Sequence, residues 1–364
     1  MEQLRFLFPL DGDCLTSRDG VLEDGALWVE VRVAAPSGSG VTVNGVPARE
    51  TEPGLWSVRL PLDWGKTELL ARGASESSIA VFRLKGGEKG FRLSVDDNLL
   101  FLADLTENRE RYRSIFENPY LAMYKRIHEE TGVCVHLNLF YETGDLSEFS
   151  MPRPYFNLSM MTDRFREEWR VNAHWLKMSF HARTEFPDCP YSTPEPEKIA
   201  ADCRRVQEEI CRFAGEECLS RVTTVHFCAC PVENLRALRE LGVRGFTGFC
   251  GDEDDVVLAY CYPKDIARRV AQRHFWVDTK EQLLCGRIDA ILNTIPPKEL
   301  PERLEHIWAT GGKSGFVEFM IHEQYFYPDY DFYIPEFEDM VRMACRSAQE
   351  RGYEGRGLSG LLDL

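Results

Sequence analysis

The segment Phe91-Arg-Leu-Ser-Val-Asp-Asp-Asn98 opens the part of the chain in which strand and helix patterns alternate. Apolar and polar side chains alternate up to Val95, which is typical of a short β-strand, and two adjacent acids follow directly. Parallel α/β folds place active-site residues at the carboxyl ends of their strands. Asp96 and Asp97 repel each other unless one binds a cation or keeps a proton, so the pair indicates either a reactive site or an ordinary polar turn.

Strand and helix patterns alternate from this stretch onward. The predicted strands cover residues 91–95, 133–141, 175–181, 222–226, 243–249, 289–293 and 315–322, with an inserted hairpin near 256–262. The predicted helices cover residues 112–130, 161–172, 195–217, 232–241, 300–309 and 335–351. Alternation over about 270 residues implies a parallel sheet, and the number of units allows it to close into a (β/α) barrel.

The first part of the chain has a different pattern. Short strands are predicted at 27–33, 40–46, 55–60, 69–71 and 79–84, with a tight turn at Asn44-Gly45. Several short strands separated by turn residues favour an immunoglobulin-like β-sandwich. The glycine-rich segment 85–90 is a linker, so we expect a sandwich domain over 1–88 and a barrel domain over 89–364.

Composition limits the partners and the compartment. The chain has 364 residues and a net charge of -16, which argues against nucleic acid and anionic membranes as partners. No apolar run is long enough to span a bilayer, and the acidic N-terminus does not fit a secretory signal. The twelve cysteines are scattered through predicted elements, which fits buried thiols in a reducing cytoplasm.

Titratable residues recur at the ends of the predicted strands. Besides the acid pair, His181, His226 and His322 fall at strand ends, although the chain has only eight histidines. The carboxyl ends of barrel strands meet at one mouth. Carboxylates and imidazoles can hold a divalent ion there, and a second acid and a further histidine can move protons. The pattern therefore predicts metal-assisted hydrolysis.

Two of these stretches resemble motifs of the NodB-type polysaccharide deacetylases. Ser94-Val-Asp-Asp-Asn98 is similar to that family's first motif, a strand ending in Thr-Phe-Asp-Asp, and Phe319-Met-Ile-His322 is similar to its last, Leu-x-Leu-His. The resemblance covers about residues 90–350 and implies a distorted seven-stranded (β/α) barrel that removes acyl groups, such as acetyl, from an amino sugar or related amide. It also implies that Asp96 is the general base, Asp97 a metal ligand and His322 the general acid.

The middle motifs depart from the family pattern. The family's second motif has two metal-binding histidines separated by three residues, whereas this chain has His181-Ala-Arg-Thr-Glu185. The resemblance then implies a site of Asp97, His181 and Glu185, with zinc as the expected ion and Asp188 as a substitute for Glu185. The family's arginine and proline motif has no clear counterpart, and the segment beginning at His226 occupies its place.

Four further residues are expected to contact a carbohydrate or small amide substrate: Arg183, His226, Glu323 and Tyr325. Arg183 either pairs with Asp96 and keeps it ionised or is a solvated surface residue. Two other functions remain open. A glycoside hydrolase needs two opposed carboxylates, which an adjacent pair does not supply. A non-catalytic carbohydrate-binding protein would use the same fold without turnover.

Overall fold

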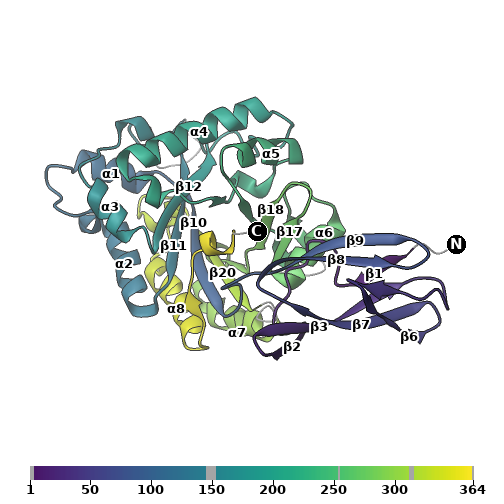
Figure 1. Ribbon diagram of the computed structural model, residues 1–364. Coiled ribbons are helices and arrows are strands. Elements are labelled where there is room, and N and C mark those ends of the chain that lie inside the picture. Colours follow the sequence, from purple (N-terminus) through teal and green to yellow (C-terminus); the bar gives the residue numbers. More distant parts are fainter. Residues whose placement is uncertain (1–3, 145–152, 253–254, 311–314, 363–364) are drawn as a thin grey trace.

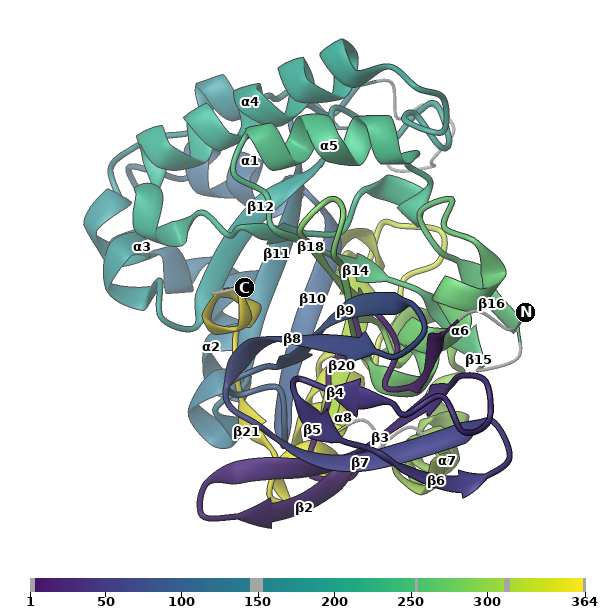
Figure 2. The same ribbon diagram turned by 45° about the vertical axis from the view of Figure 1, so that its right-hand side comes forward.

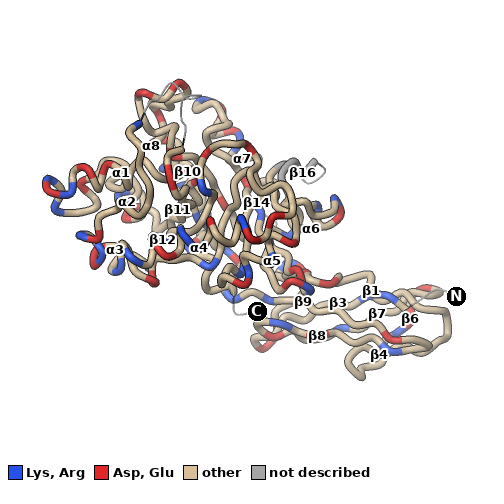
Figure 3. Tube along the Cα trace, turned by 90° about the horizontal axis from the view of Figure 1, so that it is seen from above, with Lys and Arg blue, Asp and Glu red and all other residues tan. Residues whose placement is uncertain are grey.

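The computed structural model describes residues 4–144, 153–252, 255–310 and 315–362. Two antiparallel sheets lie at the N-terminal end of the molecule, and a mixed α/β part surrounds a parallel sheet (Figures 1 and 2). Acidic and basic residues are interspersed along both parts (Figure 3). Among the described helices, none combines the length and the apolar character needed to cross a bilayer.

The two N-terminal sheets share one apolar core. The strand orders are β1-β3-β7-β6, with β2 beside β3, and β5-β4-β8-β9. Alternate side chains of β3 and β7 are buried because one face of this sheet packs on the core and the other faces water. The predicted turn is present, since Asn44 and Gly45 both have positive φ between β4 and β5. The bounds are β1 (Arg5–Phe8), β2 (Gly20–Glu23), β3 (Ala26–Ala34), β4 (Thr42–Val43), β5 (Val46–Pro47), β6 (Arg49–Glu52), β7 (Leu55–Leu62), β8 (Gly65–Arg72) and β9 (Glu76–Arg83).

The parallel sheet carries the predicted acid pair on its central strand. Its order is β12-β11-β10-β20-β19, and the short β21 pairs with the start of β10. All of these pairings are parallel. The carboxyl ends of β10, β11, β12 and β20 therefore lie at one edge of the sheet. The bounds are β10 (Gly90–Asn98), β11 (Cys134–Phe140), β12 (Leu176–Ala182), β19 (Ala290–Ile291), β20 (Phe316–His322) and β21 (Glu354–Gly355).

A second sheet, β13-β14-β18-β17, is joined to the first at both sides. On one side Met178 of β12 forms a parallel bridge to Leu219, just before β13. On the other side β18 runs almost directly into β19, which pairs with β20. The parallel strands thus follow one another in a ring. The bounds are β13 (Val222–Thr223), β14 (Gly245–Gly248), β15 (Cys250–Asp252), β16 (Asp255–Leu258), β17 (Phe275–Asp278) and β18 (Leu283–Arg287), of which β15 and β16 form a separate hairpin.

The helices follow the strands they connect, and their ends have local causes. The predicted helix 112–130 begins only at Pro119, because Asn118 caps the amide of Leu121, and it ends at Gly132 in the left-handed conformation. The long helix α4 stops at Phe213, before Gly215 with a φ of 103°. The bounds are α1 (Leu100–Glu107), α2 (Pro119–Thr131), α3 (Arg166–Asn172), α4 (Pro196–Phe213), α5 (Val232–Glu240), α6 (Lys264–Arg273), α7 (Leu300–Thr310) and α8 (Phe337–Gln349).

Each of the seven predicted strand ranges after residue 90 contains a strand, but the sequence did not predict every element. Helices α1 and α6 and the antiparallel hairpin β17–β18 were missed. The four residues of β17 are all buried, so the hairpin shows no alternation of apolar and polar residues. The N-terminal sheets pack against this hairpin, where Asp13 pairs with Trp276 and Phe82 shares an apolar cluster with Phe275.

Strand β10 is buried at every position although more than half of its residues are polar. Near its start, Arg92 donates from Nε and Nη2 to the two carboxylate oxygens of Glu318, both at 2.7 Å. The pair is almost fully buried, with side-chain exposures of 2% and 0%. Nη1 of Arg92 lies 2.9 Å from Nδ1 of His136. An arginine can only donate, so Nδ1 of His136 accepts and Nε2 carries the proton.

The polar chain continues from His136 toward the acid pair. Nε2 of His136 donates to Ser179 Oγ at 2.8 Å, and Ser179 donates to Asn138 Oδ1 at 2.6 Å. Asn138 in turn donates from Nδ2 to Asp96 Oδ1 at 2.6 Å. A connected series of buried hydrogen bonds therefore runs through the ring of strands and ends at Asp96.

We predict that Glu318→Gln lowers the free energy of unfolding by about 3–5 kcal/mol, because Arg92 loses its counter-charge in a buried site. Chemical denaturation measures this loss. The matched control is Glu23→Gln, whose partner Arg59 is half exposed, and its expected cost is below about 1 kcal/mol. Equal losses in the two variants would contradict the larger contribution to stability that we assign to the buried pair of Arg92 and Glu318.

Burial, reinforced by Arg92, places the pKa of His136 well below its usual value. The unfolded chain therefore binds one more proton than the folded chain below about pH 6.5, and stability decreases as pH falls through that point. We predict that in His136→Gln the free energy of unfolding falls less steeply with decreasing pH, by about 1.4 kcal/mol for each pH unit below about 6.5. Chemical denaturation at pH 5, 6 and 8 measures the free energy of unfolding. The same pH dependence in the variant and the unmodified chain would contradict the prediction.

A candidate metal centre at the carboxyl ends of the strands

A β-bulge at the end of β10 sets the direction of the acid pair. The register with β11 shifts between Val95 and Asn98, and Asp97 has a φ of 62°. Successive side chains of a regular strand point to opposite faces, but an extra residue in the left-handed conformation re-aims the chain. Both acids consequently contact polar side chains at the carboxyl ends of the strands: Asp96 contacts Asn138, and Asp97 contacts His181. Their exposed fractions are 3% and 8%.

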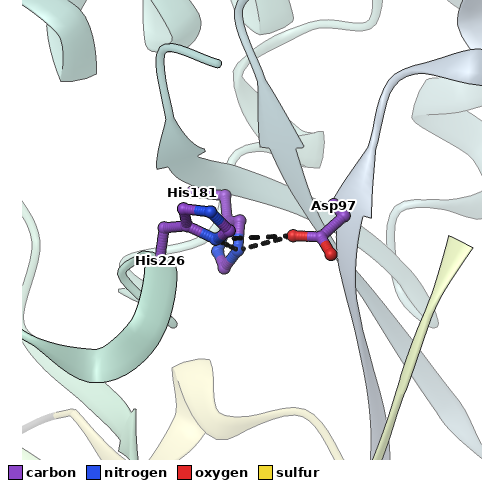
Figure 4. A group of neighbouring side chains, drawn as sticks. All are labelled: Asp97, His181 and His226. Carbon is purple, nitrogen blue, oxygen red and sulfur yellow. Dashed lines mark hydrogen bonds and ion pairs between the residues drawn. The ribbon is translucent and has the colours of Figure 1, made fainter. Parts of the chain in front are cut away.

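Three side chains bring potential ligand atoms together (Figure 4). Asp97 Oδ1 lies 3.1 Å from His181 Nε2 and 3.5 Å from His226 Nδ1, and the two nitrogens are 3.0 Å apart. The residues come from the ends of β10 and β12 and from the segment after β13, and all three are buried. A tetrahedral ion with bonds of about 2.0–2.1 Å separates its ligand atoms by about 3.3–3.4 Å, close to these distances.

The outer nitrogens of both histidines contact backbone carbonyls. Nδ1 of His181 lies 2.5 Å from the carbonyl oxygen of Thr224, and Nε2 of His226 lies 3.0 Å from that of Glu185. Carbonyl oxygens only accept, so each outer nitrogen carries a proton and each inner nitrogen of a neutral ring presents a lone pair. Asp97 Oδ1 is buried and accepts no well-aligned hydrogen bond. Three electron-rich atoms thus converge, and this arrangement fits a bound cation.

The charge states agree with a cation site. Although burial opposes ionisation of Asp97, the nearby histidines hold its pKa below the usual value. Burial, with the neighbouring His181, lowers the pKa of His226 to about 4, so this ring is neutral at pH 7. Against the effect of burial, Asp96 and Asp97 raise the pKa of His181. A proton on His181 therefore balances part of the negative charge when no cation is bound, and an ion would displace it.

His322 lies on the other side of Asp97. Its Nε2 is 3.9 Å from Asp97 Oδ2, and its Nδ1 is 2.8 Å from Asn293 Oδ1. Gln324 donates to the same Asp97 oxygen at 2.9 Å. The side chain of His322 is 24% exposed, so it is the histidine of this group that solvent reaches. It is positioned to exchange protons with a bound molecule.

Glu185 is placed differently from the expectation that it supplies the third ligand. Its side chain is half-buried and lies outside the group of converging ligand atoms, and burial together with Asp97 raises its pKa to about 9. The main chain of Glu185 is what reaches the site, through its carbonyl contact with His226. His226, expected among the substrate-binding residues, occupies the third corner instead. Its position at a strand end was the signal for this role.

Two other expected substrate contacts lie elsewhere. Arg183 is half exposed and bonds Glu142 at 2.7 Å, so it does not pair with Asp96 and the surface alternative holds. Glu323 is fully buried, and its carboxylate accepts from the amides of Leu99 and Phe101 at the start of α1. Its position is that of a helix cap rather than a substrate contact.

Aromatic rings pack around the group. Phe140 is buried against both histidines, with its ring centroid 5.3 Å from that of His181 and 5.1 Å from that of His226. From His322, ring contacts lead outward through Tyr325 and Tyr330 to an exposed phenylalanine, Phe332, at centroid distances of 6.1, 5.2 and 5.7 Å. Tyr325 therefore contacts His322, and its expected role in substrate binding stays a prediction.

Solved structures similar to this chain come from the family that the two motifs resemble. A peptidoglycan N-acetylglucosamine deacetylase with a bound N-hydroxybenzamide is 9% identical, with a TM-score of 0.36 over 76% of this chain and 90% of that one. A candidate polysaccharide deacetylase from Mycobacterium smegmatis is 10% identical, with a TM-score of 0.38 over 75% and 94%. A CE4 family pseudoenzyme from Bacillus anthracis is 10% identical, with a TM-score of 0.33 over 77% and 67%.

No family model matches the sequence, and no curated protein sequence matches it. At these identities and TM-scores the structural similarity assigns no role to any residue of this chain.

We predict that His226→Ala weakens zinc binding by more than about 100-fold, because loss of a ligand exceeds the 10–100-fold effect of losing an outer partner. Glu185→Gln tests the alternative that Glu185 is the third ligand. It is expected to retain its affinity for zinc within about tenfold, because the backbone carbonyl that contacts His226 is unchanged. Competition with a chromogenic chelator measures both. The reverse order of effects would make Glu185 the ligand.

Proposed function

We propose that this protein is a metal-dependent hydrolase that removes an acyl group, such as acetyl, from an amino sugar or related amide. The observation that carries the proposal is the convergence of one carboxylate oxygen and two imidazole nitrogens, from three strand ends, beside a further acid and a further histidine. Non-catalytic metal sites have no need of the two extra proton-carrying groups.

The donor set favours zinc. Two imidazoles and one carboxylate are ligands that zinc accepts readily, and three protein ligands are typical of its catalytic sites. An ion held by Asp97, His181 and His226 would polarise an amide carbonyl and increase the acidity of water. The ring of seven parallel strands, β10 to β14, β18–β19 and β20, supports the assignment of a distorted (β/α) barrel with this site at its mouth.

The chain's own residues can divide the proton transfers. Asp96 is fixed through Oδ1 by Asn138, which leaves it oriented to accept a proton from water through its second oxygen. His322 is held through Nδ1 by Asn293, and its partly exposed Nε2 can donate a proton to the departing amine. Each group is thus oriented by a hydrogen bond with one amide side chain.

Aromatic residues beside the mouth support a carbohydrate as substrate. Ring contacts connect His322 through Tyr325 and the buried Tyr330 to the exposed Phe332, and flat apolar rings bind the apolar faces of sugars. All twelve cysteines are free thiols, which fits a reducing cytoplasm. A small acylated sugar conjugate is the substrate that we propose for such a compartment.

We predict that the zinc-loaded protein releases acetate from N-acetylated amino sugars and that Asp96→Asn and His322→Ala each lower kcat by about 10²–10⁴-fold. An enzyme-coupled acetate assay on a panel of such sugars measures this. Arg183→Gln, which removes a surface ion pair, is the control and keeps its rate.

Two other outcomes would reject the proposal. Zinc binding with sugar binding but no acetate release identifies a non-catalytic carbohydrate-binding protein. Release of a free sugar from a glycoside identifies a glycosidase. A third outcome, full activity in Asp96→Asn, would reject only the assignment of Asp96 as the base.

A further inference from the structure

A cavity of about 200 Å³ lies at the opposite end of the parallel strands from the candidate metal centre. Arg92, Cys134 and Lys177, near the starts of β10, β11 and β12, form one side of it. The C-terminal segment 357–360 forms the other side. The full lining is Arg92, Cys134, Val135, His136, His174, Trp175, Lys177, Ser220, Gly357, Leu358, Ser359 and Gly360.

The lining is basic and contains no carboxylate, in a chain with a net charge of -16. Arg92 is balanced on its far side by Glu318, but Lys177 is not balanced in this way. The ammonium of Lys177 donates to the backbone carbonyl of Glu217, while the carboxylate of Glu217 pairs with Arg170. Among the described residues, no acid lies within ion-pair distance of Lys177. Burial lowers the pKa of Lys177, as expected for a partly enclosed cation without a counter-ion.

The facing wall offers hydrogen-bond donors and space. A methyl group placed on Gly357 or Gly360 would meet nothing within 4 Å, so a ligand can approach the backbone closely at both positions. Ser220 accepts from the amide of Val222, which leaves its hydroxyl proton to donate into the cavity. Ser359 adds a second hydroxyl. Donors on several sides of one enclosed space match an anion with several oxygens.

We propose that this cavity is a second binding site, which takes a small tetrahedral oxyanion of the phosphate or sulfate class. Lys177 supplies the charge, the hydroxyls of Ser220 and Ser359 supply hydrogen bonds, and the open space beside Gly357 and Gly360 admits the ligand. The site does not depend on the proposed hydrolase activity, because it shares no residue with the metal centre. Its volume also admits a phosphate that carries a small organic group.

Calorimetric titration of the full chain with inorganic phosphate at low ionic strength tests the proposal, with sulfate and a sugar phosphate as parallel arms. Lys177→Met should weaken phosphate binding by about 10–100-fold, the effect of one charge-assisted hydrogen bond. Lys198→Met removes a lysine from a different cavity and should leave the affinity unchanged. Tighter binding of the sugar phosphate than of phosphate would identify an ester as the ligand; the reverse order would identify the free ion.

A second pair of variants keeps the test valid if Lys177→Met fails to fold. Gly360→Asp and Gly360→Asn fill the same open space and differ only in charge. The aspartate variant should lose phosphate binding, and the asparagine variant should keep it within about threefold. Absence of phosphate and sulfate binding in the unmodified chain, or equal affinities in the two Gly360 variants, would overturn the proposal.

Discussion

Two backbone carbonyls determine what the candidate metal centre can bind. The carbonyl oxygens of Thr224 and Glu185 accept hydrogen bonds from the outer nitrogens of His181 and His226, so the inner nitrogens face each other and Asp97 with lone pairs. Such a group is electrostatically unfavourable without a positive charge between its members. The suitability of this group for a cation therefore depends on the main chain of the segments after β12 and β13, and not on the side chains alone.

The direction of the main chain also explains why the sequence predicted Glu185, and not His226, as the third ligand. A histidine–x₃–glutamate spacing after β12 suggested Glu185 as a ligand, whereas the loop turns its carbonyl, not its carboxylate, toward the site. His226 lies at the third position instead, in the segment that follows the two-residue strand β13. The spacing of two residues in a loop gives their separation along the chain, but it does not determine which way their side chains point.

Much of the fold could be predicted from the sequence. Each predicted strand range from residue 91 onward contains a strand, because parallel strands and connecting helices leave clear periodic patterns. Asp97 and His181 could be placed together because strand ends converge. The bulge before Asn98 could not be predicted, since it depends on the pairing with β11, and neither could the hairpin β17–β18, whose fully buried residues show no alternation. Arg183 and Glu323 were misjudged because proximity in sequence to a site does not determine exposure.

The left-handed backbone at Asp97 also limits which residues can replace this aspartate. A φ of 62° is tolerated by glycine, asparagine and aspartate, whereas branched side chains would add strain of about 1–2 kcal/mol at that residue. Asparagine or glycine at this position would keep the bend of the strand while removing the carboxylate. The carboxylate can therefore be lost by substitution without loss of the architecture.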